Sequence, residues 1–247
     1  PAPVEDRVGT VRVLRWLPAA ASRGRVIHFH GGGYRIGCPE MEGPYASALA
    51  KACGVEVIVP QYRLAPESPF PAALNDALEV LWGTTADRPL VISGGSAGGG
   101  LAAGLALLAR DEGRKVAGLV LHSPWLDLTV TAPSYWHNAE SDEMFSTESA
   151  KLAAELYLQG EVPTHPAASP LMGDLAGLPP VLITAGTGEV LIDDATHFHA
   201  ALQEAGVPSR LLAIDSMAHV APTRDPAATG AGECFAAVVE FVNGLTA

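Results

Sequence analysis

Short apolar runs alternate with longer segments of helical periodicity along almost the whole chain. Four of the short runs are continuous in valine, isoleucine and leucine, which is typical of strands covered on both faces of a parallel sheet. The predicted strands are Val11–Leu14, Val26–Phe29, Val55–Pro60, Leu90–Ser93, Leu119–His122, Val181–Ala185 and Arg210–Ile214. The predicted helices are Pro44–Lys51, Pro71–Trp82, Ala97–Arg110, Thr147–Leu158, Asp193–Ala205 and Glu233–Leu245. This alternation indicates an α/β fold, with a mostly parallel central sheet and helices on both of its faces.

The stretch from Leu128 to Pro179 departs from this alternation, because it contains no strand pattern. It is polar and punctuated by proline around a single predicted helix. An insertion of this length between two strands is usually a lid or a pocket wall. We therefore expect one domain over residues 1–247 with a small helical cap at about 128–179. A peripheral helical excursion is the alternative.

Composition narrows the class of protein. Of the 247 residues, 48% are hydrophobic and 17% are charged, which supports one large core and argues against disorder. The net charge of −12 disfavours nucleic acid or an anionic membrane surface as a partner. No run approaches the roughly 18 apolar residues of a membrane span, and the first residues show no leader pattern. Cys38, Cys53 and Cys234 lack C-x-x-C spacing, as is typical of free thiols, so we expect a cytoplasmic protein.

The candidate chemistry begins where the Leu90–Ser93 run ends, in the sequence Gly94-Gly95-Ser96-Ala97-Gly98. A strand that passes through G-x-S-x-G into a helix rich in alanine and leucine describes a nucleophile elbow, a turn so tight that only glycines fit around the serine. Glycine-rich turns between strand and helix also bind phosphate. The motif alone therefore leaves both a nucleophile and an anion-binding loop open.

A nucleophilic serine needs an imidazole that takes its proton and a carboxylate that orients the imidazole. In α/β hydrolases these residues follow in the order serine, acid, histidine. Glu189 and Asp193 follow the sixth predicted strand, and His219 follows the seventh. Each lies just past the carboxyl end of a strand, at the edge of the sheet where Ser96 is expected. The spacing therefore predicts a triad of Ser96, one of the two acids, and His219.

Three consecutive glycines supply the remaining component of such a site. His30-Gly31-Gly32-Gly33 follows the Val26–Phe29 strand and matches the H-G-G-G loop of lipases and esterases. The backbone N–H groups of that loop, with the one after the nucleophile, bind the oxyanion of a tetrahedral intermediate. We expect Gly31, Gly32 and Ala97 to be these donors. A merely flexible loop is the alternative.

Together these motifs make the chain resemble the hormone-sensitive-lipase family of α/β hydrolases, the bacterial family IV esterases. The resemblance covers roughly residues 10 to 245. It is carried by His30–Tyr34 (HGGGY), Tyr62–Glu67 (YRLAPE), Pro69–Ala73 (PFPAA) with Asp76, Gly94–Gly99 (GGSAGG), Ser123–Leu128 (SPWLDL) and Ser169–Leu171 (SPL). It implies the α/β-hydrolase fold, with no metal or organic cofactor.

The resemblance also implies roles for individual residues. Ser96 corresponds to the nucleophile, His219 to the general base, and Gly31, Gly32 and Ala97 to the oxyanion donors. His30 corresponds to a structural residue that holds the glycine loop in shape. The family resemblance further implies a small-molecule ester as substrate, and a homodimer formed through the last strand and helix.

The chain departs from the family pattern in three places. Gly95 stands where the family usually has aspartate, so a side chain beside the elbow is missing. The usual acid motif D-P-L-R-D corresponds to Glu189-Val190-Leu191-Ile192-Asp193, which favours Glu189 over Asp193 as the triad acid. Family members also carry a few dozen residues before the first strand, which form half of the cap. We expect here either a segment that is missing or an unusually open pocket.

Other side chains are weighed by their place in the pattern. The candidates for pocket contact are Tyr34, beside the oxyanion loop, Trp125, just past the end of the Leu119–His122 strand, and Met144 and Phe145 in the insertion. His28 and His122 lie on predicted strands and are expected to be buried and hydrogen bonded. His197 and His199 do not share a helix face, which argues against a metal pair.

The expected function is that of a carboxylesterase that cleaves short-acyl esters through an acyl-serine intermediate. An N-acetyl amide hydrolase or a lactone hydrolase would use the same residues, and nothing in the sequence distinguishes these activities. In a different class stands a small-molecule receptor without activity, as the plant gibberellin receptors of this family are. Such receptors lose a triad member, whereas this chain retains a serine, an acid and a histidine.

Overall fold

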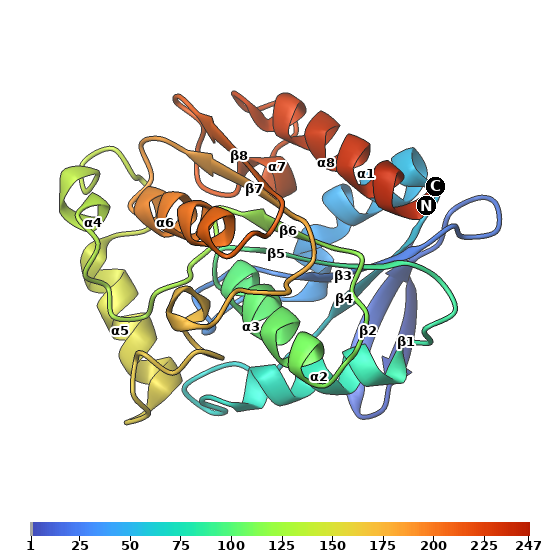
Figure 1. The fold of residues 1–247 in the computed structure, drawn as a ribbon, viewed down its shortest axis with the longest axis horizontal. Helices are drawn as coiled ribbons and strands as arrows, with labels where there is room; N and C mark the ends of the chain where they lie inside the picture. The colour runs from blue at the N-terminus through green and yellow to red at the C-terminus, as the bar shows by residue number, and fades with distance from the viewer. Residues whose placement is uncertain (1) are drawn as a thin grey trace.

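The structure is a computed structural model and describes residues 2–247. Its eight strands form one sheet in the order β1-β2-β4-β3-β5-β6-β7-β8, and all neighbours from β4 to β8 run parallel (Figure 1). The strands are β1 (Val4–Val8), β2 (Val11–Trp16), β3 (Arg25–Phe29), β4 (Glu56–Pro60), β5 (Leu90–Gly95), β6 (Gly118–His122), β7 (Val181–Gly186) and β8 (Ser209–Ile214).

Helices cover both faces of this sheet. The α-helices are α1 (Gly43–Cys53), α2 (Ala72–Gly83), α3 (Ala97–Asp111), α4 (Ser134–His137), α5 (Thr147–Leu158), α6 (Ile192–Glu204), α7 (Ala221–Arg224) and α8 (Ala231–Thr246). Two short 3₁₀ helices are η1 (Pro39–Glu42) and η2 (Pro170–Met172). Helices α1 and α8 pack on one face, and α2, α3 and α6 pack on the other (Figure 1). The predicted doubly wound architecture is confirmed.

Successive residues of the central strands contribute to opposite cores. In β5, Val91 packs under α1 and α8, whereas Ile92 packs under α2 and α3. In β7, Leu182 and Ile183 divide in the same way. Because both faces are covered, these strands are buried at every position and mostly apolar, which is why continuous valine, isoleucine and leucine runs marked them in the sequence.

All seven predicted strands and all six predicted helices are present, each with bounds within two residues of the prediction. The prediction missed β1, which pairs antiparallel with β2 through a turn at Gly9. Four of the five β1 side chains are exposed, so the strand carries no apolar alternation that periodicity could detect. It forms because β2 offers backbone partners at the edge of the sheet. The four-residue helices α4 and α7 were also missed.

The segment between β6 and β7 contains α4, α5 and η2 and no strand, as predicted for 128–179. Helices α4 and α5 lie together at one end of the sheet (Figure 1). None of the helices within residues 2–247 combines the length and the apolar character needed to cross a bilayer.

Candidate active site

Ser96 lies at the turn from β5 into α3, with a positive φ of 54°. A side-chain carbon on Gly94 would lie 2.1 Å from the Gly98 carbonyl oxygen, and one on Gly98 would lie 2.2 Å from the Phe29 carbonyl oxygen. These contacts show why glycine is required on both sides of the serine. The Ser96 N–H donates to the His122 carbonyl at 2.9 Å, which holds the strained turn in place.

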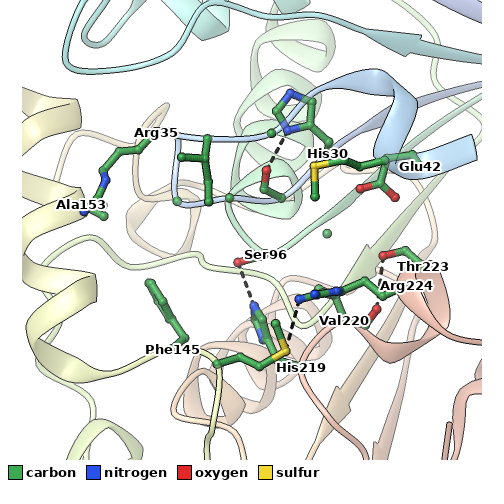
Figure 2. A pocket seen from close by; sticks show the side chains of 18 of the residues that line it. His30, Arg35, Glu42, Ser96, Phe145, Ala153, His219, Val220, Thr223 and Arg224 are labelled. Carbon is green, nitrogen blue, oxygen red and sulfur yellow. Dashed lines mark hydrogen bonds between the residues drawn. The ribbon is translucent and has the colours of Figure 1, made fainter.

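Three predicted residues meet at this turn (Figure 2 shows the Ser96–His219 bond). His219 Nε2 lies 3.0 Å from Ser96 Oγ, and His219 Nδ1 lies 2.6 Å from Glu189 Oε2. Ser96 and His219 are 5% and 7% exposed, and Glu189 is 2% exposed. An imidazole between a serine hydroxyl and a buried carboxylate can accept the hydroxyl proton while the carboxylate stabilises the resulting positive charge.

Of the two candidate acids, the structure brings only Glu189 to the histidine. Glu189 follows β7 directly, and the Gly186 N–H donates to its Oε1 at 2.5 Å. Asp193 lies one turn further, in α6, where its Oδ2 accepts a hydrogen bond from the Ser134 N–H at 2.8 Å. Asp193 therefore anchors the start of α4 and has no contact with His219.

Sequence reasoning gave no role to Ser123, which contacts both arms of the triad. Its Oγ donates to Glu189 Oε1 at 2.8 Å and accepts from the Val220 N–H at 3.0 Å. The side chain is fully buried, and its φ is +44°. The signals in the sequence were its position directly after β6, before a proline, and its place at the start of the SPWLDL motif. These signals indicated a strand end and did not reveal which side chains Ser123 meets.

The glycine loop lies against the nucleophile. A side-chain carbon on Gly31 would lie 3.4 Å from Ser96 Cβ, and Gly31 and Gly32 line the same cavity as Ser96. Within residues 2–247 the N–H groups of Gly31 and Gly32 have no hydrogen-bond acceptor. Ala97 is the first residue of α3, where the N–H groups of a helix are unpaired and its dipole favours negative charge. The arrangement can therefore bind an oxyanion.

His30 supports this loop from behind. Its Nδ1 lies 2.7 Å from the Gly31 carbonyl oxygen, so that nitrogen carries the proton and donates. The ring stacks on Tyr62 with centroids 4.2 Å apart, and the Tyr62 hydroxyl donates to the His30 carbonyl at 2.7 Å. Burial lowers the pKa of His30, which keeps the ring neutral. These contacts agree with the structural role that the resemblance implied.

A cavity of about 580 Å³ opens beside Ser96. Met144 and Phe145 of the β6–β7 segment line it, as expected, and the Phe145 ring stacks on His219 with centroids 6.1 Å apart. Tyr34 and Trp125 do not line it, so the expectation for these two is wrong. Both are core residues with at most 1% exposure.

Tyr34 has a φ of +60° and is buried in an aromatic cluster. Its ring stacks on Tyr157 of α5 with centroids 3.8 Å apart, and it also contacts Trp125. These aromatic rings pack the β6–β7 segment against the oxyanion loop. They lie behind the residues that line the cavity and support them.

Gly95 occupies the position where the resembled family has aspartate. A side-chain carbon there would lie 3.3 Å from Val220 Cγ1, closer than an unstrained contact. Val220, the residue after His219, therefore fills the space beside the elbow that a side chain at 95 would need. Both residues line the cavity.

Buried polar side chains extend beneath the site. His28 Nδ1 lies 2.9 Å from Ser93 Oγ, and His122 Nε2 lies 3.0 Å from the Tyr45 hydroxyl, so both histidines are buried and hydrogen bonded as predicted. Burial lowers the pKa of His122 to about 3. Residues 2–247 contain no cluster of three histidine, cysteine or acidic side chains arranged to hold a metal ion.

Among the acidic residues near the site, Asp194 has the pKa that the fold shifts most. Its Oδ2 accepts hydrogen bonds from the Leu126 and Asp127 N–H groups at 2.7 and 3.0 Å, which joins α6 to the chain after β6. The residue is fully buried, and burial raises its pKa to about 8. It therefore carries a proton at neutral pH for much of the time.

Comparison with known proteins identifies relatives of this chain. Residues 26–223 match a family described as having the α/β-hydrolase fold. An acetyl-hydrolase of Streptomyces hygroscopicus is 39% identical over 212 residues, which cover 83% of this chain and 71% of the relative. An esterase of Acinetobacter venetianus is 33% identical over 207 residues, covering 81% and 68% of the two chains.

Solved structures extend the likeness to the whole fold. The crystal structure of an esterase from the bacterial hormone-sensitive lipase family superposes with a TM-score of 0.94 at 34% sequence identity. The superposition covers 99% of this chain and 84% of that esterase.

Proposed function

Since the chain belongs to the hormone-sensitive-lipase family of α/β hydrolases and its relatives include proteins named esterase, we propose that it hydrolyses short-acyl esters with Ser96 as the nucleophile. The observation that carries the assignment of residues is the 3.0 Å contact between Ser96 Oγ and His219 Nε2. In the first step Ser96 Oγ attacks the ester carbonyl and His219 Nε2 accepts its proton. Glu189 holds the imidazole in orientation and stabilises its positive charge.

The tetrahedral intermediate would be bound by the N–H groups of Gly31, Gly32 and Ala97. His219 then gives its proton to the departing alcohol, which leaves an acyl group on Ser96. A water molecule, deprotonated by the same imidazole, attacks the acyl carbonyl and releases the carboxylic acid. No step requires a metal or an organic cofactor.

The proposed preference for short acyl chains rests on the wall of the cavity. Phe145 and Met144 close one side of it, and Tyr34 and Trp125 fill the interior behind that side. A side-chain carbon on Gly33 would lie 3.5 Å from Ala153 Cβ, so the oxyanion loop and α5 are in near contact at the other end. A long acyl chain would have to displace these groups.

Acetyl amide cleavage is the second candidate, because the 39% identical relative is named acetyl-hydrolase, a name that covers acetyl esters and acetyl amides alike. It would use the same residues, with His219 protonating a poorer leaving group. A receptor without activity is disfavoured, because serine, histidine and acid are all present and hydrogen bonded to one another. The cytoplasmic location and the homodimer stay predictions; the three free cysteines support a reducing compartment.

The test is hydrolysis of p-nitrophenyl esters from acetate to dodecanoate, with p-nitroacetanilide as the amide and Ser96→Ala as the control. We expect the highest kcat/KM at two to four carbons and a loss of about 10⁴-fold or more in the variant. Turnover that survives in the variant would disprove the assignment of the nucleophile. Turnover of the anilide alone would establish the amide hydrolase instead.

A further inference from the structure

Two arginines beside Ser96 have no oxygen partner, in a chain whose net charge is −12. The side chain of Arg35 makes no hydrogen bond or ion pair within residues 2–247, and the side chain of Arg224 donates only to Met144 Sδ, at 3.2 Å. Both line the cavity, and Figure 2 shows their side chains on either side of Ser96. A thioether is a weak acceptor, so ten N–H donors are nearly unused at this site.

Every other arginine side chain of residues 2–247 pairs with an oxygen atom. Seven of them pair with carboxylates: Arg12, Arg15, Arg25, Arg63, Arg88, Arg110 and Arg210. Arg7, Arg23 and Arg114 donate to backbone carbonyl oxygens. Acidic side chains outnumber basic ones by 27 to 15, yet neither arginine in the cavity is paired. Guanidinium groups without oxygen partners are therefore confined to the cavity.

One carboxylate, that of Glu42, also lines the cavity. Its Oε2 lies 3.2 Å from His28 Nε2, and the residue is only 7% exposed. In Figure 2 it lies on the opposite side of Ser96 from Arg35. Glu42 pairs with neither arginine, so it leaves their charge available to a ligand.

We propose that this cavity selects esters that carry an anionic group, a carboxylate in the simplest case, bound by Arg35 and Arg224 while Ser96 attacks the ester carbonyl. The inference rests on the proposed esterase function and adds the substrate class. A planar guanidinium matches a carboxylate with two parallel N–H···O bonds, and partial burial of Arg35 strengthens the attraction. Because the surface as a whole repels anions, local positive charge is what lets an anionic substrate reach Ser96.

The experiment compares matched charged and neutral esters. One pair is p-nitrophenyl hemiglutarate and its methyl ester, with the charge on the acyl side. The other is 4-acetoxybenzoate and its methyl ester, with the charge on the alcohol side. Each kcat/KM ratio is divided by the ratio of the hydroxide-catalysed rates. We expect a corrected preference of about tenfold or more for the anion in one pair, which falls as sodium chloride rises from 0.05 to 0.5 M.

Variants locate the source of the preference. Arg35→Gln and Arg224→Gln should each lower the charged-to-neutral ratio by up to about tenfold, the size of one charge-assisted hydrogen bond in a half-exposed site. Arg210→Gln is the matched control, because Arg210 is exposed, pairs with Glu240 and lies outside the cavity. It should leave the ratio unchanged.

The outcomes separate the two proposals. Ser96-dependent turnover of p-nitrophenyl acetate with ratios near one in both ester pairs would overturn the anionic substrate and keep the esterase. An equal loss of preference in Arg210→Gln would also overturn it, because bulk charge would then be the cause. No Ser96-dependent turnover of any ester would overturn the proposed function itself.

Discussion

The two sides of Ser96 are built differently. On one side lie His219 and Glu189, which are at most 7% exposed. A hydrogen bond of 2.6 Å joins them, and one of 3.0 Å joins His219 to Ser96. On the other side lies the cavity wall, where Met144 is 45% exposed and Ile36 is 66% exposed. Buried polar groups are fixed by their partners, whereas exposed long side chains keep their rotamer freedom. The chemistry is therefore rigidly positioned, and the choice of substrate depends on side chains that can change with little effect on the fold.

Replacing the triad acid is the most direct way to disrupt the buried side of the site, which Glu189 and His219 form. Glu189→Gln should lower kcat by about 10³-fold or more, because the amide no longer stabilises the charged imidazole of His219. Asp193→Asn should cost less than about tenfold, since Asp193 holds only the Ser134 N–H. Steady-state kinetics with p-nitrophenyl acetate measures both. Similar losses in the two variants would mean that the acid is misassigned.

Ser123 tests how much the buried side depends on its supporting hydrogen bonds. Ser123→Ala should lower kcat/KM by roughly tenfold, because Glu189 loses one donor and the Val220 N–H loses its acceptor. Without the Ser123 donor, the negative charge stays concentrated on the Glu189 carboxylate. The acid limb of the pH–rate profile should therefore move to higher pH.

Ser134→Ala is the control for this variant. Ser134 is similarly buried and donates to the Val190 carbonyl, next to Glu189, without touching the triad. It should lower stability and leave the pH–rate profile in place. If the two variants have the same profile, Ser123 acts only through the fold.

Substitutions in the exposed cavity wall should change the preference for acyl-chain length more than the rate of catalysis. Met144→Ala and Phe145→Ala enlarge the cavity, so the ratio of kcat/KM for octanoate to that for acetate should rise several-fold. Trp136→Ala is the control, because Trp136 belongs to the same segment and lies outside the cavity lining. An unchanged chain-length profile in all three variants would place the acyl chain elsewhere.

The last prediction concerns the stability of the fold beneath the triad, and no change in activity is involved. Folding raises the pKa of Asp194 from 3.8 to about 8, so between these values the folded protein keeps a proton that the unfolded chain has lost. The retained proton stabilises the folded protein fully below about pH 4. This contribution to the free energy of unfolding is lost as the pH rises to about 8, by at most about 1.4 kcal/mol per pH unit.

Asp194→Asn removes this titration and keeps one acceptor for the Leu126 and Asp127 N–H groups. Urea unfolding at pH 5, 6.5 and 8 should show that the free energy of unfolding of the variant rises relative to that of the wild type as the pH rises. Parallel stability curves would contradict the raised pKa.

Local sequence patterns were sufficient for the sheet and for the two glycine turns. Apolar runs marked seven strands, because burial on both faces requires apolar residues at successive positions. The turn around Ser96 was recognisable because close backbone approach at Gly94 and Gly98 excludes a side chain. The second turn was recognisable because Gly32 and Gly33 have positive φ values of 113° and 60°, which favour glycine. The candidate nucleophile, the histidine and the oxyanion donors followed from these local constraints and the order of the chain.

Tertiary structure alone decided the features that depend on which side chains meet across the fold. The bonds of Ser123 to Glu189 and Val220 join residues far apart in the sequence, and only the fold shows that the Arg35 side chain has no partner. The motif register favoured Glu189 over Asp193, and the fold brings Glu189 to His219. Tyr34 is a core residue because α5 brings Tyr157 onto its ring. Hydrogen bonds and ring contacts act over a few ångströms in space, so residue type and spacing along the chain do not determine them.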